Sequence, residues 1–296
     1  MSTLLYDVHV SGMTPVAPAA LRLPDGTPGA WSPLAHTLIH GPTEAALVDP
    51  PITLAQAAAL GDWVEGFGKR LSFIYVTHGH GDHWLGTRPL VERFPGVRVL
   101  ATRGTIDAIR AAAPDGHATG LWPAAFPEQL AAAPVELDTA PKEGFEVDGH
   151  VLLPVEAGHS DMDDTSVLYA PSIGLVAAGD VVYNNVHQYL AEAADGGIDA
   201  WRHALDVVAD LDPARVVAGH RDPTRPDAPS DIAETRAYLD AAEEVLAGRP
   251  TRRGYFDEMT RRHPERVNPL TVWMSALRLL PPEEDRPLAP EPGGEG

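Results

Sequence analysis

The sequence predicts a mixed α/β fold, and three observations lead to this class. The chain has 296 residues, of which 44% are hydrophobic and 22% charged, so it carries enough apolar material for a large core. In the N-terminal part, short apolar runs alternate with segments of helical period, which is typical of βα units. From Val135 onward, short apolar runs separated by turn residues follow one another, which indicates consecutive strands.

In the N-terminal part, each element follows from a local pattern. Residues 12–33 are rich in Pro, Gly and Ala and are expected to form an irregular arm over the surface. Thr53 is the expected N-cap of a helix with apolar residues at helical spacing. Residues 71–76 form a nearly continuous apolar run, which is typical of a strand buried on both faces. The other elements expected here are strands at 34–40, 45–48 and 97–101, and helices at 53–68, 84–94 and 103–113.

The C-terminal part is expected to contain a run of strands and then helices. Asp199 is the expected N-cap of one helix, and a second helix at 230–247 is expected to end at Gly248. Asn268 and Pro269 are expected to begin a third, amphipathic helix. The strands are expected at 135–137, 145–147, 151–155, 166–169, 175–178 and 215–218. The expected apolar face of the third helix consists of Leu270, Trp273, Leu277 and Leu280.

These elements divide the chain into three parts. Residues 1–248 are expected to form the main domain, and residues 249–280 a helical C-terminal extension. The apolar face of the last helix would dock on the core or on a second subunit, so a homo-oligomer formed through the extension is one of two expected arrangements. Residues 281–296 are rich in Pro, Glu and Gly and are expected to be a disordered acidic tail.

Charge and cysteine content argue against several classes of partner. The chain has 22 Lys and Arg against 42 Asp and Glu, a formal charge of −20, so nucleic acids and anionic membranes are not expected partners. No apolar run approaches the ~20 residues that span a bilayer, and residues 1–10 lack the basic start of a secretory signal. The chain has no cysteine, which excludes thiolate metal sites and fits a cytoplasmic location.

A cluster of histidines follows the run at 71–76, where a buried strand is expected to end. Residues 77–83 read Thr-His-Gly-His-Gly-Asp-His and contain the side chains of His78, His80, Asp82 and His83. Imidazole and carboxylate groups are the ligands that suit Zn, Fe or Mn. The two glycines allow the loop to fold tightly around an ion. The segment therefore predicts a metal site without sulfur ligands.

Three further strand ends carry a glycine followed by a side chain that can bind a metal. His159 follows Gly158, Asp180 follows Gly179, and His220 follows Gly219. The repetition makes a chance histidine-rich loop a poor explanation of the first cluster. The sequence therefore predicts that these side chains meet at one edge of the fold.

The order His-x-His-x-Asp-His, then His, then Asp, then His resembles the metallo-β-lactamase fold superfamily, and the resemblance covers roughly residues 34–222. It implies a four-layer αββα sandwich with two divalent metal ions at one edge, most simply zinc, with iron or manganese as alternatives. Asp49, at the end of its strand, matches an early aspartate that steadies the ligand loop. The implied ligands are His78, His80 and His159 for the first ion, Asp82, His83 and His220 for the second, and Asp180 as the bridge.

The implied chemistry is hydrolysis of a small molecule. Two cations that share a water lower its pKa toward neutrality, and Asp82 is then the expected general acid/base. The bridging Asp180 is similar to that of the hydroxyacylglutathione hydrolases, the acyl-homoserine lactonases and related esterases. The Asp-x-x-Tyr motif that ends at Tyr183 is similar to the lactonases. In this group the phenol would donate to the substrate oxyanion. The expected substrate is therefore a small ester, lactone or thioester, although the bulky Trp84 departs from the lactonase pattern.

Two other functions fit part of the same pattern. An iron oxygenase resembling the persulfide dioxygenases would reuse some of the ligands on a single iron ion. A non-catalytic, metal-dependent binding protein would need the ligands but not Asp82 as an acid/base. His187 follows Asp180 closely enough to face the pocket, so it is a candidate either to support the metal ligands or to contact the substrate.

Overall fold

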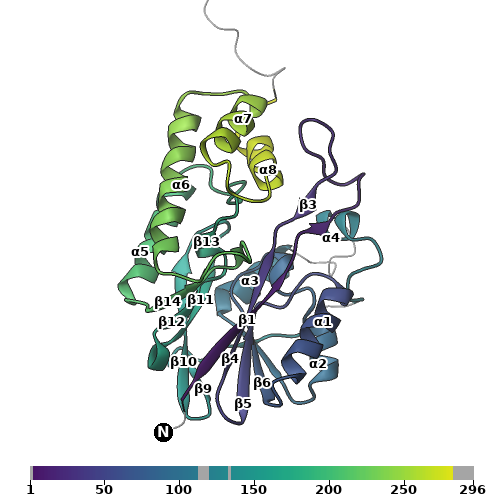
Figure 1. Cartoon of the computed structure of the whole chain (residues 1–296), viewed down its shortest axis with the longest axis vertical. Helices are drawn as coiled ribbons and strands as arrows, with labels where there is room; N and C mark the ends of the chain where they lie inside the picture. Colours follow the sequence, from purple (N-terminus) through teal and green to yellow (C-terminus); the bar gives the residue numbers. More distant parts are fainter. Residues whose placement is uncertain (1–2, 113–119, 133–134, 283–296) are drawn as a thin grey trace, which may run out of the picture.

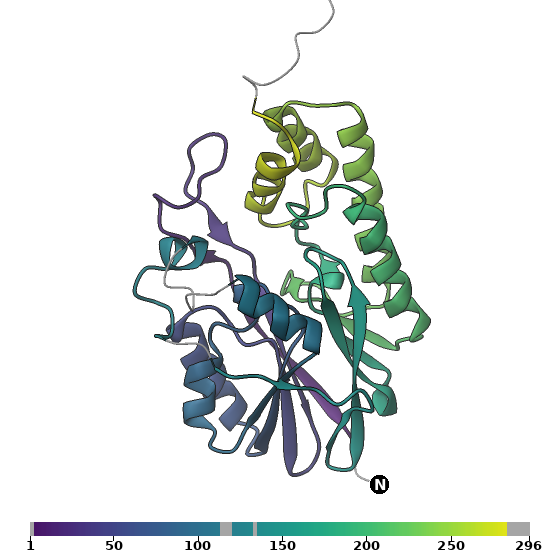
Figure 2. The ribbon, with the colours of Figure 1, turned by 180° about the vertical axis from the view of Figure 1, so that it is seen from behind.

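The computed structural model describes residues 3–112, 120–132 and 135–282 and consists mainly of two β-sheets with helices on both outer sides (Figures 1 and 2). The larger sheet has the strand order β13-β15-β4-β5-β6-β7-β8, with β1 also paired to β4, and the smaller has the order β14-β12-β11-β10-β9. A separate ribbon pairs β2 with β3. In the middle of the larger sheet, strands that follow one another in the sequence are also neighbours in space, namely β4, β5, β6 and β7.

The strands of the larger sheet are β1 (Leu5–Ser11), β4 (Leu34–His40), β5 (Glu44–Val48), β6 (Arg70–Val76), β7 (Arg98–Ala101), β8 (Asp138–Thr139), β13 (Tyr183–Asn184) and β15 (His220–Arg221). Those of the smaller sheet are β9 (Phe145–Val147), β10 (His150–Gly158), β11 (Thr165–Ala170), β12 (Leu175–Ala177) and β14 (Arg215–Val217), and the ribbon consists of β2 (Thr14–Pro15) and β3 (Ala30–Trp31). The helices are α1 (Leu54–Glu65), α2 (Thr87–Arg93), α3 (Arg103–Ala112), α4 (Leu121–Ala125), α5 (Gly197–Asp210), α6 (Ser230–Ala247), α7 (Arg252–Arg262) and α8 (Leu270–Leu279).

Three hydrophobic clusters separate the four layers. One lies between the larger sheet and α1, α2 and α3, and a second between the two sheets. The third lies between the smaller sheet and α5 and α6, and it continues under α7 and α8. Neighbouring residues of one strand enter different clusters: Ile74 packs toward the helices and Tyr75 toward the other sheet. This explains the continuous apolar run at 71–76 and confirms the predicted αββα sandwich with C-terminal helices.

Several predicted elements differ from the structure at their ends. The N-terminal strand β1 and the ribbon strands were not expected, and the strand expected at 135–137 is displaced to β8. Thr53 caps α1 as predicted, and its hydroxyl accepts the Gln56 amide. The prediction for Asp199 is wrong, because α5 is capped by Gly196, whereas Asp199 lies in the first turn and accepts a hydrogen bond from Arg202.

The C-terminal helix α8 is buried only in part on the expected face, because Trp273 and Leu280 pack against the third cluster whereas Leu277 does not. Leu270 is buried as predicted, but Leu277 is 37% exposed, while Val272 and Ala276 are buried. The helix contacts the third cluster on one side and α7 on another, where Trp273 meets Phe256 at 6.1 Å between ring centroids. The amphipathic pattern of the sequence therefore identified only part of the buried face. The expected acidic tail at 281–296 falls almost entirely outside the described residues, and none of the described helices is long and apolar enough to cross a membrane.

Candidate metal centre

The histidine loop is held in place by Asp49. β5 and β6 are parallel neighbours, so their C-terminal ends meet, and Asp49 directly follows β5. Its carboxylate accepts the Thr77 amide at 2.8 Å, the Thr77 hydroxyl at 2.7 Å and His83 Nδ1–H at 3.0 Å. Asp49 itself has a left-handed backbone, with φ of 54°, which Asp tolerates better than most residues. The expected role of Asp49 in steadying the loop is confirmed.

Six of the seven predicted ligands lie together at the edge of the sandwich, in three overlapping groups whose ligand atoms lie within 4.8 Å of one another. His78 and His83 each belong to two groups, so the groups form one continuous centre. The groups are His78, His80 and Asp161, then His78, His83 and Asp180, then Asp82, His83 and His220.

Asp180 lies between the groups as a bridging ligand would. Its Oδ1 is 3.3 Å from His83 Nε2, and its Oδ2 is 3.1 Å from His220 Nε2. A side chain at Gly219 would collide with the Asp180 carboxylate and with the backbone of Gly179. The glycine before His220 is therefore required for the close approach of the two strand ends.

The hydrogen bonds of the candidate ligands leave single atoms of several side chains available for a metal ion. His78 Nδ1–H donates to the Thr77 hydroxyl at 3.0 Å, and His220 Nδ1–H donates to the Pro33 carbonyl at 3.0 Å. The opposite atoms, His78 Nε2, His83 Nε2 and Asp180 Oδ1, are buried without a hydrogen-bond partner in the described part of the chain. Such atoms are costly unless an ion or water satisfies them. One nitrogen anchored and the other left for the metal is the usual arrangement of ligating histidines.

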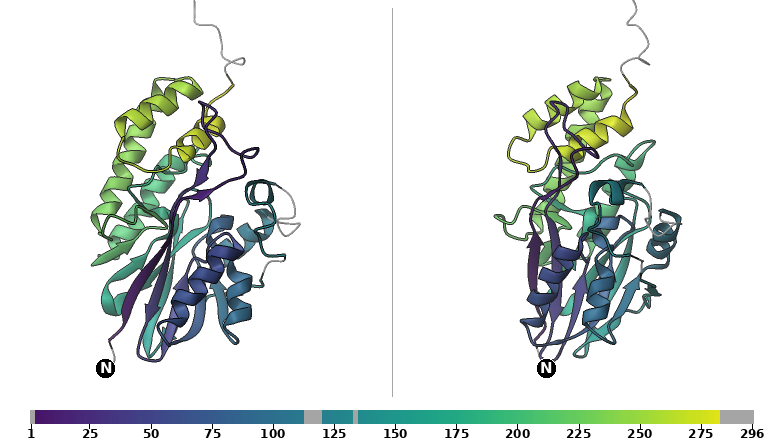
Figure 3. Two further views of the ribbon diagram at one scale, coloured as in Figure 1. Left: turned by 45° about the vertical axis from the view of Figure 1, so that its right-hand side comes forward. Right: turned by 90° about the vertical axis from the view of Figure 1, so that its right-hand side faces the viewer.

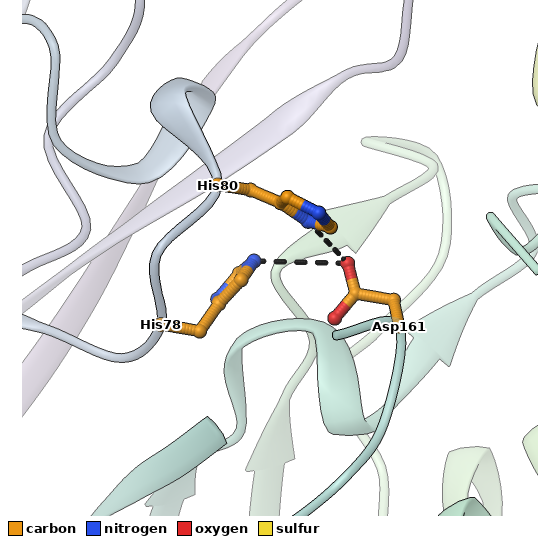
Figure 4. A group of neighbouring side chains, drawn as sticks. All are labelled: His78, His80 and Asp161. Carbon is orange, nitrogen blue, oxygen red and sulfur yellow. Dashed lines mark hydrogen bonds and ion pairs between the residues drawn. The ribbon is translucent and has the colours of Figure 1, made fainter. Parts of the chain in front are cut away.

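Asp161 is a candidate ligand that the sequence analysis missed. Its Oδ2 is 2.7 Å from His80 Nδ1 and 3.7 Å from His78 Nε2, and Figure 4 shows the three side chains pointing toward one another. Burial raises the pKa of the Asp161 carboxyl to about 6, against the opposing effect of His80. The sequence did offer a signal for Asp161, because this carboxylate lies in the loop that follows β10, two residues after the predicted ligand His159.

The structure does not bring His159 into any of the three groups. Its Nδ1 lies 2.7 Å from Asp163 Oδ1, and its Nε2 is buried without a hydrogen-bond partner among the described residues. His159 therefore stays a predicted ligand, with one nitrogen anchored and the other buried without a partner among the described residues, while Asp161 is the carboxylate that lies beside His78 and His80.

Paired variants distinguish the two assignments. Asp161→Ala is expected to reduce the zinc content by one ion per chain, because it removes the carboxylate that faces His78 and His80. His159→Ala is expected to retain both ions. Elemental analysis after gel filtration in the presence of zinc measures the difference. The reverse pattern would restore His159 as the ligand and leave Asp161 with a supporting role.

In the structure the Tyr183 hydroxyl contacts the Asp180 carboxylate. The hydroxyl donates to Asp180 Oδ2 at 2.8 Å, and the tyrosine side chain is fully buried, without lining the cavity beside the metal centre. Burial and the neighbouring Asp180 raise the pKa of the phenol well above its usual range, so it stays a donor. The phenol therefore fixes the orientation of the Asp180 carboxylate, and a contact between Tyr183 and a substrate oxyanion stays a prediction.

A cavity of about 190 Å³ opens onto the centre from the side of Asp82, Asp180 and His220. Its other walls come from distant segments: β3, α4, the loop after β13, and α8. Trp84 does not line it; the indole N–H donates to the Gly79 carbonyl at 3.1 Å and supports the ligand loop. His187 does not line it either and is buried 3.1 Å from the Tyr238 hydroxyl. The apolar wall consists of Trp31, Leu121, Trp122, Leu270 and Met274.

Comparison with known proteins agrees with this geometry. The family description that matches the sequence is that of the metallo-beta-lactamase superfamily, over residues 36–220, more than half of the chain. The matched segment contains all the predicted ligands. No curated protein sequence matches the chain.

Solved structures of metallo-beta-lactamases share the fold at low sequence identity. The enzyme from Pontibacter korlensis is 19% identical with a TM-score of 0.57, covering 81% of this chain and 99% of that one. FIM-1 from Pseudomonas aeruginosa, in its mono-zinc form, is 19% identical with a TM-score of 0.54, covering 80% and 94%. The enzyme from Hirschia baltica is 17% identical with a TM-score of 0.53, covering 80% and 97%. The ligand order, the sandwich and the family match agree, and the chain belongs to the metallo-beta-lactamase superfamily.

Proposed function

We propose that this protein is a dinuclear metal-dependent hydrolase of small, uncharged esters, lactones or thioesters. Members of the superfamily are typically metal-dependent hydrolases. The observation that carries the dinuclear proposal is the position of Asp180. One of its oxygens faces His83 and the other faces His220, and His78 lies in the same group of possible ligands. A single carboxylate shared in this way suits two ions better than one.

The proposed ligands divide between the two ions. His78, His80 and Asp161 would hold the first, Asp82, His83 and His220 the second, and Asp180 both. Zinc is the proposed metal, because the donors are imidazole and carboxylate groups and because a structural neighbour is known in a mono-zinc form. When bound, a pair of divalent cations supplies a Lewis acid for the substrate carbonyl and lowers the pKa of a water toward neutrality.

The chain's own groups then perform three tasks. The Asp82 carboxylate, which lines the cavity, accepts the proton of the attacking water and returns it to the leaving alkoxide or thiolate. The Tyr183 hydroxyl keeps Asp180 in its orientation through the 2.8 Å hydrogen bond. The tryptophan and leucine side chains of the cavity wall exclude bulk water and strengthen the electrostatic interactions inside.

The charge of the cavity favours an uncharged substrate. Among the described residues that line it there is no Lys or Arg, whereas Glu192 lies at its edge, with Oε1 3.3 Å from His80 Nε2. A substrate that carries a carboxylate would contact no Lys or Arg among the described lining residues and would be repelled by Glu192, although the charge of Arg278 partly offsets that of Glu192. The apolar wall offers contact area to an alkyl or aryl group instead.

One specific observation supports the alternative of an iron oxygenase. His78, His80 and Asp161 form a group of two histidines and one carboxylate, which is the ligand set of many non-haem iron oxygenases. The remaining ligands, Asp82, His83 and His220, would have no role in a mononuclear enzyme, so hydrolysis is the favoured proposal.

The proposal is tested on the purified protein with metal analysis and a pair of matched aryl esters. We expect two zinc ions per chain, and hydrolysis of a neutral ester at least tenfold faster in kcat/KM than of its carboxylate-bearing analogue. A tenfold ratio corresponds to about 1.4 kcal/mol, and like-charge repulsion across ~4 Å near a protein surface costs about 4 kcal/mol. Removal of the ions by a chelator should abolish both activities. Glu192→Gln is expected to reduce the difference in kcat/KM between the neutral and the carboxylate-bearing ester.

Two outcomes would contradict the proposal. One bound iron ion with oxygen uptake on a sulfur substrate would favour the oxygenase. Two bound ions without turnover of esters, lactones or thioesters would favour a metal-dependent binding protein.

A further inference from the structure

The N-terminal arm reaches the metal centre through Trp31. The indole N–H of this residue, at the end of β3, donates to Asp82 Oδ2 at 2.8 Å, across a sequence separation of 51 residues. In the described part of the chain, this is the one hydrogen bond to Asp82 from outside the ligand imidazoles. The same Asp82 oxygen also faces the two histidines of its ligand group. It lies 3.3 Å from His220 Nε2 and 3.6 Å from His83 Nε2.

The two residues after Trp31 make contacts of the same kind. The Pro33 carbonyl accepts His220 Nδ1–H at 3.0 Å, and the Ser32 hydroxyl accepts the Asn268 side-chain amide at 2.6 Å. Residues 31–33 thus contact two ligands of one group, Asp82 and His220, and also Asn268, which lies two residues before α8 begins. Figure 3 shows the arm running alongside the C-terminal helices in both views.

The tryptophan ring is itself fixed by its surroundings. Trp31 packs against Trp122 with 4.8 Å between ring centroids and against Phe126 with 6.2 Å. The backbone on which it stands is paired in register, Thr14 with Trp31 and Pro15 with Ala30. The N–H therefore points in one direction, whereas a carboxylate without such a donor can rotate about its last bond.

We propose that Trp31 is a positioning residue for the second metal site: it fixes the plane of the Asp82 carboxylate and so sets the affinity of the ion that Asp82, His83 and His220 would hold. The inference rests on the proposed dinuclear centre. Hydrogen bonds to ligating carboxylates commonly change metal affinity by 10- to 100-fold when they are removed. Because Asp82 is also the proposed acid/base, the same contact would orient it toward the attacking water.

The test compares Trp31→Phe with Trp122→Phe in the full chain, by competition for zinc against a chromophoric chelator. Both variants replace an indole by a phenyl ring in the same aromatic cluster, but only the first removes a donor to Asp82. We expect Trp31→Phe to weaken the binding of one of the two ions by 10- to 100-fold and to alter the visible spectrum of the Co²⁺-substituted protein. Trp122→Phe should leave both zinc affinities within about twofold of wild type.

The outcomes separate this inference from the proposed function. If Trp31→Phe binds both ions as wild type does, the positioning role is wrong and the dinuclear hydrolase stands. If both variants reduce the affinity for both zinc ions equally, the aromatic cluster acts through packing and the positioning role is again wrong. If the wild-type protein binds no second ion, the dinuclear proposal fails and the inference fails with it.

Discussion

Asp180→Ala is expected to lower kcat by about 1,000-fold or more on whichever ester or lactone proves to be a substrate, and to reduce the metal content of the protein at the same time. The carboxylate faces His83 and His220 through different oxygens, so its loss affects both proposed ions. A metal centre supplies several kcal/mol of transition-state stabilisation, and each 1.36 kcal/mol corresponds to a tenfold change in rate. Steady-state kinetics and elemental analysis on the same preparation measure the two effects.

Asp199→Ala is a matched control, because it removes an exposed aspartate that pairs with Arg202 in the first turn of α5 and belongs to none of the ligand groups. It should change neither metal content nor rate. A complete complement of two ions in Asp180→Ala would contradict the bridging position of this residue, even if activity were lost.

Asp49→Ala is expected to reduce the free energy of unfolding of the metal-free protein by about 3 to 5 kcal/mol, which is the usual effect of removing one partner from a buried charged network. The substitution leaves the Thr77 amide and hydroxyl and His83 Nδ1 without their acceptor. It also places alanine in a left-handed backbone conformation, since Asp49 has φ of 54°. Urea denaturation with a chelator present measures the change without the contribution of the ions.

Asp49→Asn provides the comparison, because asparagine tolerates the left-handed conformation and keeps one acceptor oxygen. Asp49→Asn should reduce the free energy of unfolding by clearly less than Asp49→Ala does. Equal stability of Asp49→Ala and wild type would show that the loop is held by other contacts.

The strands and helices with strong local patterns were predictable from the sequence. β4 and α6 have the bounds expected for them, and β6 was expected within one residue, because apolar period, turn residues and caps are local signals. β1 was not expected, although it is long, because its residues are mostly half-exposed and it is stabilised by pairing with β4. The helix α7 was not expected either: it is rich in charged residues, and its buried side chains, Tyr255 and Met259, are too few to produce a clear period.

The sequence by itself determined the superfamily, the histidine loop and the later strand-end candidates for ligands, Asp180 and His220, because side chains that follow buried strands keep their positions relative to those strands. Only the tertiary structure placed Asp161 beside His80, turned the Tyr183 hydroxyl onto Asp180, and brought Trp31 to Asp82. These contacts join side chains from elements that meet only when the sheets and helices are packed. The direction of a side chain across such a contact depends on burial and on the hydrogen-bond partners available there, and neither is encoded in local spacing.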